Sequence, residues 1–388
     1  MSPKRVLFAS LAAAALAWAT LVAASFADRG GSFADAQREL FFRRGVAALN
    51  DYYMPWKCAH EGYAQAVDEV EYAAPDGRIL TMERFDRCYP PLILGLYRTL
   101  PYSNFAAAAS SFAWAAVFLL ALAAVARASG ASPRDAFAFV ATGFFLFALE
   151  RANPVPLAAA AVAIFLAWHD SPCRKRRLAA AVALALAVAL KLSPALLGVL
   201  YLRRRDWRQL ALSAGLALAL VLLPFFLPGG AEGLSDWFAA ALRHGREMAP
   251  FSAFGYTPFV RAVRILEGAD WKVGIGGWCL ATKLTGLLFL AGAAVLPRRN
   301  DAILWAVTGL LLAPGNMLFY AGLYLVPVCL MRSVDWRRDS RRDWLEAAVW
   351  FVLFAALQLP YGGFTLNRLA AAAAVFALPF FAIRKGGV

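Results

Sequence analysis

The stretch AFAFVATGFFLFALERANPVPLAAAAVAIFLAW, residues 136–168, indicates the architecture of the whole chain. Two apolar arms of about 14 residues flank a polar break that runs from Glu150 to Pro156. As a helix each arm would be about 21 Å long, which is too short to cross a bilayer. Because basic residues flank the stretch on both sides, we expect both of its ends on the cytoplasmic side. The break would then be the tip of a hairpin inside the membrane.

Two later apolar stretches repeat this pattern. Residues 178–202 lie between two arginine-rich clusters and carry Lys191 at their middle. Residues 302–330 also lie between arginines and are broken by a Pro-Gly-Asn sequence that ends at Asn316. Non-helical backbone survives at membrane depth only where protein or a water-filled cavity supplies its hydrogen bonds. We therefore expect the three polar tips to line one cavity that opens to the outside.

Composition agrees with a polytopic membrane protein. Of the 388 residues, 61% are hydrophobic and 16% are charged, and the mean hydropathy is +0.58, whereas soluble domains carry about 25% charged residues. These values exclude a secreted disulfide scaffold, a disordered chain and an ordinary cytosolic enzyme. The formal charge of +14 arises largely from Lys and Arg clusters between apolar stretches, which is typical of cytoplasmic loops. We expect membrane lipids as partners and no nucleic acid.

The chain begins with a membrane helix and a long external loop. Residues 6–26 form an apolar run of about 20 residues, longer than the core of a signal peptide, so we predict a retained first helix. Residues 28–104 follow with nine basic and eleven acidic residues, a net charge of about minus two. We place this first extracytoplasmic loop outside, and the apolar spacing over 33–49 predicts a helix lying in the membrane interface.

A second extracytoplasmic loop is predicted over residues 229–272, with another interfacial helix over 235–247. When each broken hairpin is counted as two passes, the chain crosses or enters the membrane about 12 times. The predicted fold class is therefore an all-α polytopic membrane protein, with residues 1–388 forming a single integral membrane domain.

Asp51 is the candidate catalytic residue of the first loop. It follows the first predicted interfacial helix and precedes Tyr52 and Tyr53, so it would lie at the outer membrane surface. A carboxylate shielded by aromatic rings can have its pKa raised enough to accept a proton from a sugar hydroxyl as a general base. The alternative is an ordinary solvated aspartate in a loop.

Lys191 is preceded by thirteen apolar residues and lies next to Ser193 and Pro194. A cation inside a membrane is costly and commonly marks a functional site with an anionic partner. We favour a lipid phosphate as that partner, and the alternative is a side chain that snorkels to the interface.

Glu150, Arg151 and Asn153 occupy the tip of the first hairpin. The planar guanidinium of Arg151 suits a phosphate, and Asn153 can hydrogen-bond a sugar or the backbone. A local ion pair between Glu150 and Arg151 is the alternative.

We predict a disulfide between Cys58 and Cys88, which lie in the first external loop. This bond would close about 30 residues and stabilise the loop by a few kcal/mol.

The cysteines and histidines predict no metal site. The three histidines fall in different regions, and the chain has no His-x-x-His, Cys-x-x-Cys or nucleotide-binding motif. We therefore predict no cofactor and no bound metal.

Four short motifs follow one another along the chain in an order shared with a known family. They are Asp51-Tyr52-Tyr53, Tyr89-Pro90-Pro91-Leu92, Glu150-Arg151-Ala152-Asn153 and Lys191-Leu192-Ser193-Pro194. This order resembles glycosyltransferase family 87, whose members are polyprenyl-phosphate-sugar-dependent membrane enzymes of the GT-C superfamily, and the likeness spans most of residues 1–330. The chain departs from the family at the third motif, where many members carry Gly-Gln-x-Asn and only Asn153 fits.

The resemblance implies a GT-C-like enzyme that transfers a sugar from polyprenyl phosphate to a lipid-linked or cell-envelope glycan acceptor. It implies that Asp51 is the catalytic base and that Lys191, together with Arg151, binds the donor phosphate. One in-line displacement at the anomeric carbon would invert its configuration. The residues expected around the substrate cavity, with Tyr89 and Pro90 at its mouth, are Tyr52, Tyr89, Pro90, Glu150, Asn153, Ser252 and Asn316.

Residues 252–261 are loosely similar to an external Ser and Arg segment of the family, which is why Ser252 belongs to this set. The expected location is a bacterial plasma membrane, with the active site facing the exterior. The competing class is a transporter or flippase of a lipid-linked sugar, because broken helices and charges at mid-membrane also form transport sites. The chain shows no internal repeat that would favour this class.

Overall fold

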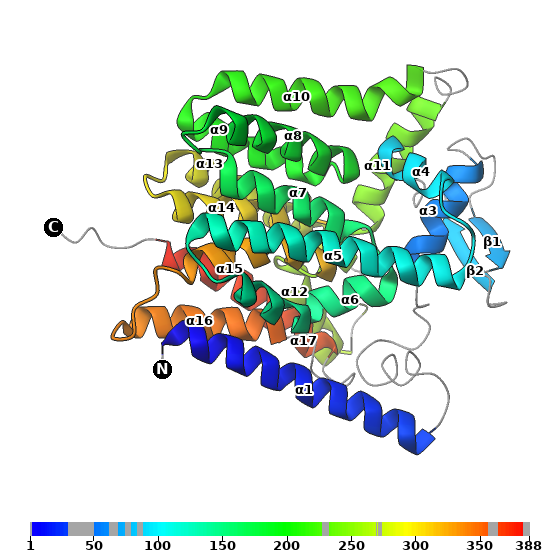
Figure 1. Ribbon diagram of the computed structural model, residues 1–388. Coiled ribbons are helices and arrows are strands. Elements are labelled where there is room, and N and C mark those ends of the chain that lie inside the picture. The colour runs from blue at the N-terminus through cyan, green and yellow to red at the C-terminus, as the bar shows by residue number, and fades with distance from the viewer. Residues whose placement is uncertain are drawn as a thin grey trace. The chain divides into compact units, whose positions relative to one another are not determined.

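The computed structural model describes residues 2–29, 50–61, 69–73, 79–83, 88–226, 233–268, 270, 274–355 and 364–382. The chain divides into two compact units, and Figure 1 labels the helices and strands of both. Unit 1 comprises Met1–Val46, Leu122–Phe147 and Pro250–Val388, and unit 2 comprises Ala47–Ala121 and Ala148–Ala249. The single membrane domain predicted from the sequence stays a prediction.

Unit 2 contains most of the predicted site residues. Its helices and strands are α3 (Asn50–Glu61), β1 (Glu69–Ala73), β2 (Ile79–Glu83), α4 (Pro91–Arg98), the first part of α5 (Asn104–Ser129), α7 (Val155–Trp168), α8 (Arg174–Leu190), η3 (Ser193–Gly198), α9 (Val199–Arg204), α10 (Trp207–Leu222), η4 (Leu223–Phe226) and α11 (Gly233–Glu247). Helix α8 packs against α7 on one side and α10 on another, and α4 contacts both α8 and α10. Short helix α4 also contacts α3, and so it connects α3 to the long apolar helices.

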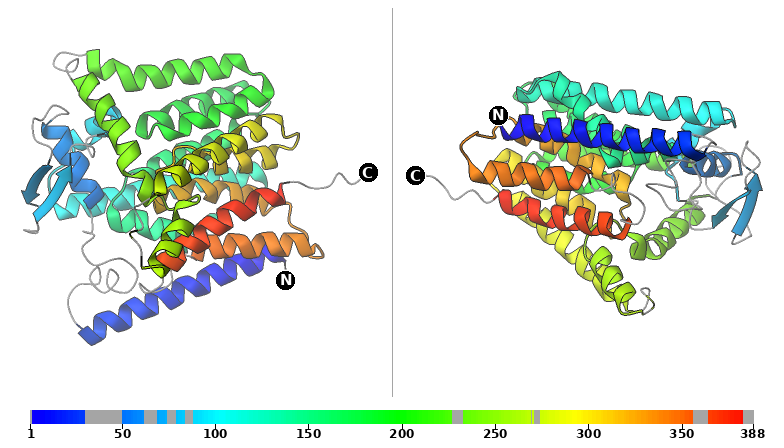
Figure 2. Two further views of the ribbon diagram at one scale, coloured as in Figure 1. Left: turned by 180° about the vertical axis from the view of Figure 1, so that it is seen from behind. Right: turned by 90° about the horizontal axis from the view of Figure 1, so that it is seen from below.

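Unit 1 is a second helical body. Its elements are α1 (Pro3–Arg29), η2 (Pro133–Ala141), most of α6 (Gly143–Arg151), α12 (Thr257–Leu266), α13 (Ile275–Val295), α14 (Arg299–Leu312), η6 (Phe319–Leu325), α15 (Val326–Arg332), α16 (Arg341–Ala355), α17 (Phe364–Ala377) and η9 (Leu378–Phe381). Helix α16 packs between α1 and α17 (Figure 2). Helices α13 and α14 pack so closely that a side chain at Gly286 would collide with the backbone of Ala313, as is usual where small residues join membrane helices.

All three predicted breaks occur. The first falls between α6 and α7, where Ala152 adopts a left-handed backbone with φ of 49°. The second falls at Lys191, between α8 and η3. The third falls between α14 and η6, where Gly315 has φ of 72°. Because the third tip lies in unit 1 and the other breaks lie at or within unit 2, the single cavity shared by all three stays a prediction.

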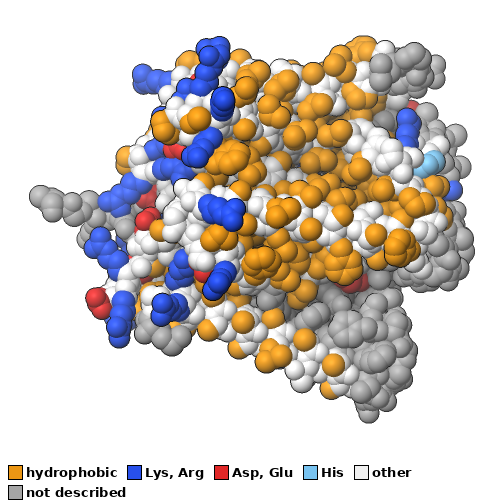
Figure 3. Space-filling model, viewed as in Figure 1, with side chains coloured by type: hydrophobic (Ala, Val, Ile, Leu, Met, Phe, Trp, Pro, Cys, Tyr) orange, Lys and Arg blue, Asp and Glu red, His pale blue; other side chains and the backbone are white. Residues whose placement is uncertain are grey.

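Apolar helices identify a membrane-embedded protein. Three helices of the described chain are long and apolar enough to cross a bilayer, namely Asn104–Ser129, Trp207–Phe226 and Ile275–Val295. Shorter apolar helices include Val155–Trp168 and Phe319–Arg332. In unit 2, hydrophobic side chains cover α8 and α10, and Lys and Arg side chains gather at one end of them (Figure 3). The total of about 12 passes is untested.

The structure adds one element that the sequence did not predict. Strands β1 and β2 form an antiparallel pair in which Glu69 lies opposite Glu83 and Ala73 opposite Ile79, so the prediction of an all-α fold is wrong for this part of the first loop. Its alternation of polar and apolar residues has the period of a strand. The interfacial helix predicted over 33–49 lies outside the described residues, whereas the helix predicted over 235–247 is present as α11.

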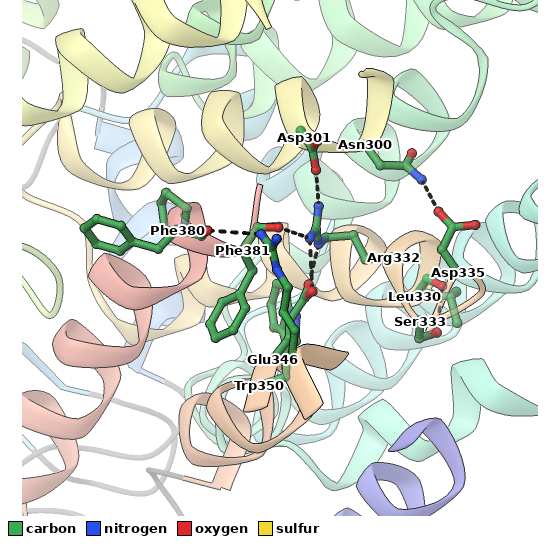
Figure 4. Close-up of polar contacts among 12 residues, drawn as sticks. Asn300, Asp301, Leu330, Arg332, Ser333, Asp335, Glu346, Trp350, Phe380 and Phe381 are labelled. Carbon is green, nitrogen blue, oxygen red and sulfur yellow. Dashed lines mark hydrogen bonds and ion pairs between the residues drawn. The ribbon is translucent and has the colours of Figure 1, made fainter. Parts of the chain in front are cut away.

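Unit 1 encloses a buried ionic cluster around Arg332 (Figure 4). Nη1 of Arg332 donates to Oδ1 of Asp301 at 2.8 Å, and its Nε and Nη2 donate to the two carboxylate oxygens of Glu346. Nη2 also donates to the carbonyl oxygen of Phe381 at 3.1 Å. Only 5% of Arg332 is exposed, so this arginine at the end of the third broken stretch is buried among its ion-pair partners. The cluster ties α14, α15, α16 and η9 together.

Candidate active site

The break after α6 directs two side chains onto one carboxylate. The left-handed backbone at Ala152 separates Arg151, the last residue of α6, from Asn153. Arg151 donates from Nε to Oδ1 of Asp51 at 3.1 Å and also from Nη2 to the same oxygen. Asn153 donates from Nδ2 to Oδ2 at 2.6 Å. A non-glycine residue with positive φ is uncommon and is concentrated at functional sites.

Asn153 is itself fixed by the start of the next helix. Its Oδ1 accepts the backbone N–H of Val155 at 2.9 Å, and its own N–H donates to the carbonyl of Ala148 at 3.0 Å. The side-chain amide therefore points its N–H₂ group at Asp51 without freedom to turn. This assigns the amide orientation from its hydrogen bonds.

Asp51 lies in the first turn of α3, where the helix N-terminus favours a negative charge. Only 8% of the residue is exposed, so the alternative of a solvated loop aspartate is wrong. Its backbone carbonyl accepts the hydroxyl of Tyr97 at 3.2 Å. Tyr97, which is fully buried on α4, thereby fixes the position of the helix turn that carries the carboxylate.

Buried tyrosines surround this turn. Tyr52 stacks edge-on against both Tyr53 and Tyr97, and its hydroxyl donates to the carbonyl of Pro101 at 2.7 Å. Burial raises the pKa of Tyr52 to about 12. Burial, and then the nearby charge of Asp51, raises the pKa of Tyr97 well above its ordinary value. Both phenols therefore remain hydrogen-bond donors at any physiological pH.

Lys191 brings a second cation toward Asp51. It follows the last residue of α8 and has an extended backbone with φ of −157° and ψ of 120°. The side chain is half-buried, and its charge interacts with the carboxylate of Asp51. Two cations from two different breaks thus act on one carboxylate.

Comparison with known proteins identifies the family. Residues 88–314 match the model of glycosyltransferase family 87. The chain belongs to glycosyltransferase family 87. It is thus a membrane-embedded glycosyltransferase, and it acts on a sugar donor and an acceptor. No curated protein and no solved structure matches the chain.

The matched region includes the motifs around Tyr89, Arg151 and Lys191, but it begins after Asp51. The expected role of Asp51 as the catalytic base of this glycosyltransferase therefore rests on two observations. They are the contacts of Asp51 with Arg151 and Asn153, and the resemblance of the motif Asp51-Tyr52-Tyr53 to the family.

The segment Tyr89-Pro90-Pro91 leads into α4 with an extended backbone. Pro90 is buried and extended, with φ of −60° and ψ of 149°, and Pro91 is the first residue of α4. Tyr89 is half-buried and packs against the aromatic cluster that contains Tyr52. Trp237 of α11 donates to the carbonyl of Cys88 at 3.2 Å, which attaches α11 to this segment of the glycosyltransferase.

Cys58 and Cys88 are not bonded to each other, so the predicted disulfide is absent from the structure. Cys58 instead lies in the buried core of unit 2, beside Tyr53 and Ala59. A tightly packed thiol there behaves as a small hydrophobic side chain.

Glu150 lies one residue before Arg151, and both of its carboxylate oxygens are buried. Arg151 pairs with Asp51, which is 100 residues away in the chain. The role of Glu150 as a cavity residue stays a prediction.

Asn316 and Ser252 belong to unit 1 of the glycosyltransferase, whereas Asp51 belongs to unit 2. Ser252 is buried and donates its hydroxyl to the carbonyls of Phe254 and Met317, at 3.0 and 3.3 Å. These bonds connect the segment after residue 250 to the third break, so the hydroxyl of Ser252 has a structural role there. A substrate contact for either residue stays a prediction.

Sequence reasoning missed two residues that position the site. Tyr97 holds the backbone of Asp51, and Ser111 of α5 donates to the carbonyl of Leu149 at 2.9 Å, near the end of α6. Neither lies in a recognisable motif, because each acts through a contact between distant segments. Among the described residues, no three His, Cys, Asp or Glu side chains gather as metal ligands would.

Proposed function

We propose that this glycosyltransferase transfers a sugar from a polyprenyl-phosphate donor to a lipid-linked or cell-envelope glycan, with Asp51 as the general base. The observation that carries the proposal is the fixed carboxylate of Asp51, which Arg151 holds through one oxygen and Asn153 through the other. A base that is positioned before the substrate arrives needs no reorganisation during the reaction.

The remaining hydrogen-bonding capacity of Asp51 suits an acceptor hydroxyl. A carboxylate has about four lone-pair sites. Arg151 occupies two on Oδ1 and Asn153 occupies one on Oδ2, which leaves a position on Oδ2. The acceptor hydroxyl would donate there and transfer its proton to Oδ2 as it attacks the anomeric carbon of the donor sugar.

The leaving group would be the donor phosphate. As the new glycosidic bond forms, the bond between the anomeric carbon and the phosphate oxygen breaks, and polyprenyl phosphate departs with the bonding electrons. Lys191 and Arg151 would stabilise the negative charge that develops on that oxygen. Because the hydroxyl attacks opposite the leaving group in one step, the configuration at the anomeric carbon inverts.

The proposed site faces the exterior of a bacterial plasma membrane. Arg203, Arg204 and Arg205 end the α8–α9 hairpin, and Arg174 begins it, so the charge rule assigns both ends to the cytoplasm. Lys191 lies at the opposite end of α8. A polyprenyl-phosphate sugar presented on the outer leaflet would then meet the site from its own side.

Reconstitution in nanodiscs with a panel of polyprenyl-phosphate sugars tests the proposal. Wild type should transfer sugar or slowly hydrolyse the donor, whereas Asp51→Asn at matched folding should do neither. Asp339→Asn is the matched control, because Asp339 is exposed in unit 1. Turnover that survives Asp51→Asn would contradict the assigned base. Movement of the donor across the bilayer without any turnover would favour a flippase.

A further inference from the structure

A polar pocket of about 340 Å³ lies in unit 1, where α14 begins and α15 ends. A volume of this size suits a small ligand or the polar part of a larger one. Figure 4 labels four of the residues that line it, Asn300, Asp301, Arg332 and Asp335. The pocket therefore borders the buried ionic cluster described above.

Both acidic side chains of the lining are already engaged. Asp301 accepts a hydrogen bond from Nη1 of Arg332 at 2.8 Å, and Asp335 accepts one from Nδ2 of Asn300 at 3.2 Å. Each bond joins the first turn of α14 to the end of α15 or to the turn that follows it. These bonds hold the two walls of the pocket in place, and they commit Arg332 to the cluster.

Two further arginines line the pocket. Arg298 is exposed and Arg299 is half-buried. Among the residues that the structure describes, no carboxylate pairs with Arg298. A guanidinium is planar and offers parallel N–H donors, which match the oxygens of a phosphate.

The start of α14 adds donors from the backbone. Arg298 is the N-cap of this 14-residue helix, and no side chain caps the helix there. The N–H groups of a first turn have no partner within the helix, and the positive end of the helix favours an anion. The pocket thus combines a helix N-terminus with two cationic side chains.

Trp336 provides a separate indication that a ligand belongs in the pocket. It lines the pocket and is only 8% exposed. Its Nε1–H is buried without a hydrogen-bond partner in the described part of the chain. Buried donors are rarely left unpaired in native proteins, so this N–H points to an acceptor that a ligand supplies.

The pocket lies at one surface of the membrane. Helix α13 ends at Val295, and the arginine pair that follows marks a cytoplasmic end by the charge rule. Val295 is 79% exposed, and Leu284 and Leu288 are exposed on the same side of α13. An apolar face of α13 therefore extends toward the pocket, as the acyl chains of a bound phospholipid require.

We propose that this pocket binds a phosphate group, carried by an anionic phospholipid of the cytoplasmic leaflet or by a soluble phosphate. The group lies between Arg298, Arg299 and the start of α14, with Trp336 as a further donor. Helix α14 is about 20 Å long, so the pocket is far from the third break at its other end. None of these residues takes part in the proposed reaction, and the inference does not rest on it.

Native mass spectrometry of the full-length protein tests the lipid source. Protein released from nanodiscs of equal parts phosphatidylcholine and phosphatidylglycerol should retain phosphatidylglycerol in preference. Arg298→Gln removes one guanidinium and should lower the apparent affinity about tenfold. Arg338→Gln is the matched control, because Arg338 is exposed and does not line the pocket.

Thermal unfolding in detergent tests the soluble source. Inorganic phosphate that replaces chloride at constant ionic strength should raise the melting temperature only slightly, because a free anion lacks the apolar contacts of a lipid. A large rise that depends on phosphate concentration, without retained lipid, would instead assign the pocket to a soluble phosphate. Trp336→Phe keeps an aromatic ring and removes only the N–H donor, so it should fold as wild type and weaken either effect.

Two outcomes would overturn the proposal. One is equal retention of the two phospholipids by wild type together with no response to inorganic phosphate. The other is lipid retention and a phosphate response that stay as strong in Arg298→Gln and Trp336→Phe as in Arg338→Gln. Because neither readout needs sugar transfer, failure of this site and failure of the proposed reaction are distinguishable.

Discussion

Arg332 in unit 1 and Arg151 in unit 2 both pair with buried carboxylates, but they use their hydrogen bonds differently. Arg332 donates to two carboxylates and a backbone carbonyl, and Trp350 donates a further bond to Glu346 at 3.4 Å. Arg151 directs its bonds to a single oxygen of Asp51. The first arrangement joins four elements, whereas the second leaves room on the carboxylate.

Exposure separates the two centres further. The side chains of Arg332 and Glu346 are 5% and 1% exposed, while those of Arg151 and Asp51 are 16% and 11% exposed. A fully buried pair contributes to stability mainly because breaking it leaves an uncompensated charge. A pair that is partly reachable, with a second cation nearby, can exchange one partner for a substrate. We therefore expect the Arg332 centre to stabilise unit 1 and the Asp51 centre to carry the chemistry.

The strongest test removes the carboxylate charge from each centre in turn. Asp51→Asn should lower the rate of sugar transfer by about 10² to 10⁴-fold, the range attributed to a general base, with little change in the melting temperature. Asp301→Asn should lower the melting temperature and leave the rate per folded molecule unchanged. Initial rates with labelled donor and thermal unfolding in detergent measure the two effects, and the reverse pattern would refute the division of roles.

The next test removes the guanidinium that unit 1 depends on. Arg332→Met should destabilise the protein by about 3–5 kcal/mol, because Asp301 and Glu346 would remain buried without a cation. Thermal unfolding measures the loss, with Arg338→Met as the control at an exposed arginine. A variant as stable as wild type would mean that the cluster does not join its four elements.

A milder change keeps the charge of Arg151 and removes its planar fork. Arg151→Lys should lower kcat/KM about 10 to 100-fold, because a lysine cannot donate two bonds to Oδ1 of Asp51 and reach a phosphate with the same geometry. Steady-state kinetics at several donor concentrations would show the loss. Full activity in Arg151→Lys would indicate that only the charge matters.

The smallest expected effect concerns Cys173, at the start of α8 in the basic end of unit 2. Backbone N–H groups of Arg176 and then Lys175 lower the pKa of its thiol. Its thiolate fraction therefore grows at a lower pH than that of a free cysteine, and labelling by a membrane-impermeant maleimide should be a few times faster near neutral pH. A pH series on sealed vesicles gives the rates.

The same experiment reports sidedness, because Cys173 is exposed while Cys329 is buried. Labelling only from the cytoplasmic side would place Lys191, at the far end of α8, toward the exterior. Labelling from outside would invert the proposed orientation of unit 2, and with it the face on which Asp51 acts. A Cys173→Ser variant controls for reaction at other thiols.

Much of the local architecture was predictable because its causes are local. Proline, glycine and isolated charges within apolar runs mark places where a helix cannot continue at low cost, and the breaks near Asn153, Lys191 and Gly315 occur where these residues stand. Helix α11 was likewise evident from its amphipathic spacing. Neither the net charge of the first loop nor the helical spacing over 33–49 predicts the hairpin of β1 and β2, which lies further along that loop.

By itself, the sequence determined a membrane-embedded chain with three broken apolar stretches, and it carried the family motifs. Only the tertiary structure decided which charges meet. Asp51 and Arg151 are 100 residues apart, and no periodicity relates them; their pairing depends on the left-handed turn at Ala152 and on tyrosine contacts that fix α3. The ion pairs of Arg332 with Asp301 and Glu346 likewise join segments that are distant in the sequence. Hydrophobicity and backbone preference act residue by residue, whereas an ion pair in a low-dielectric interior exists only once the surrounding chain has excluded water.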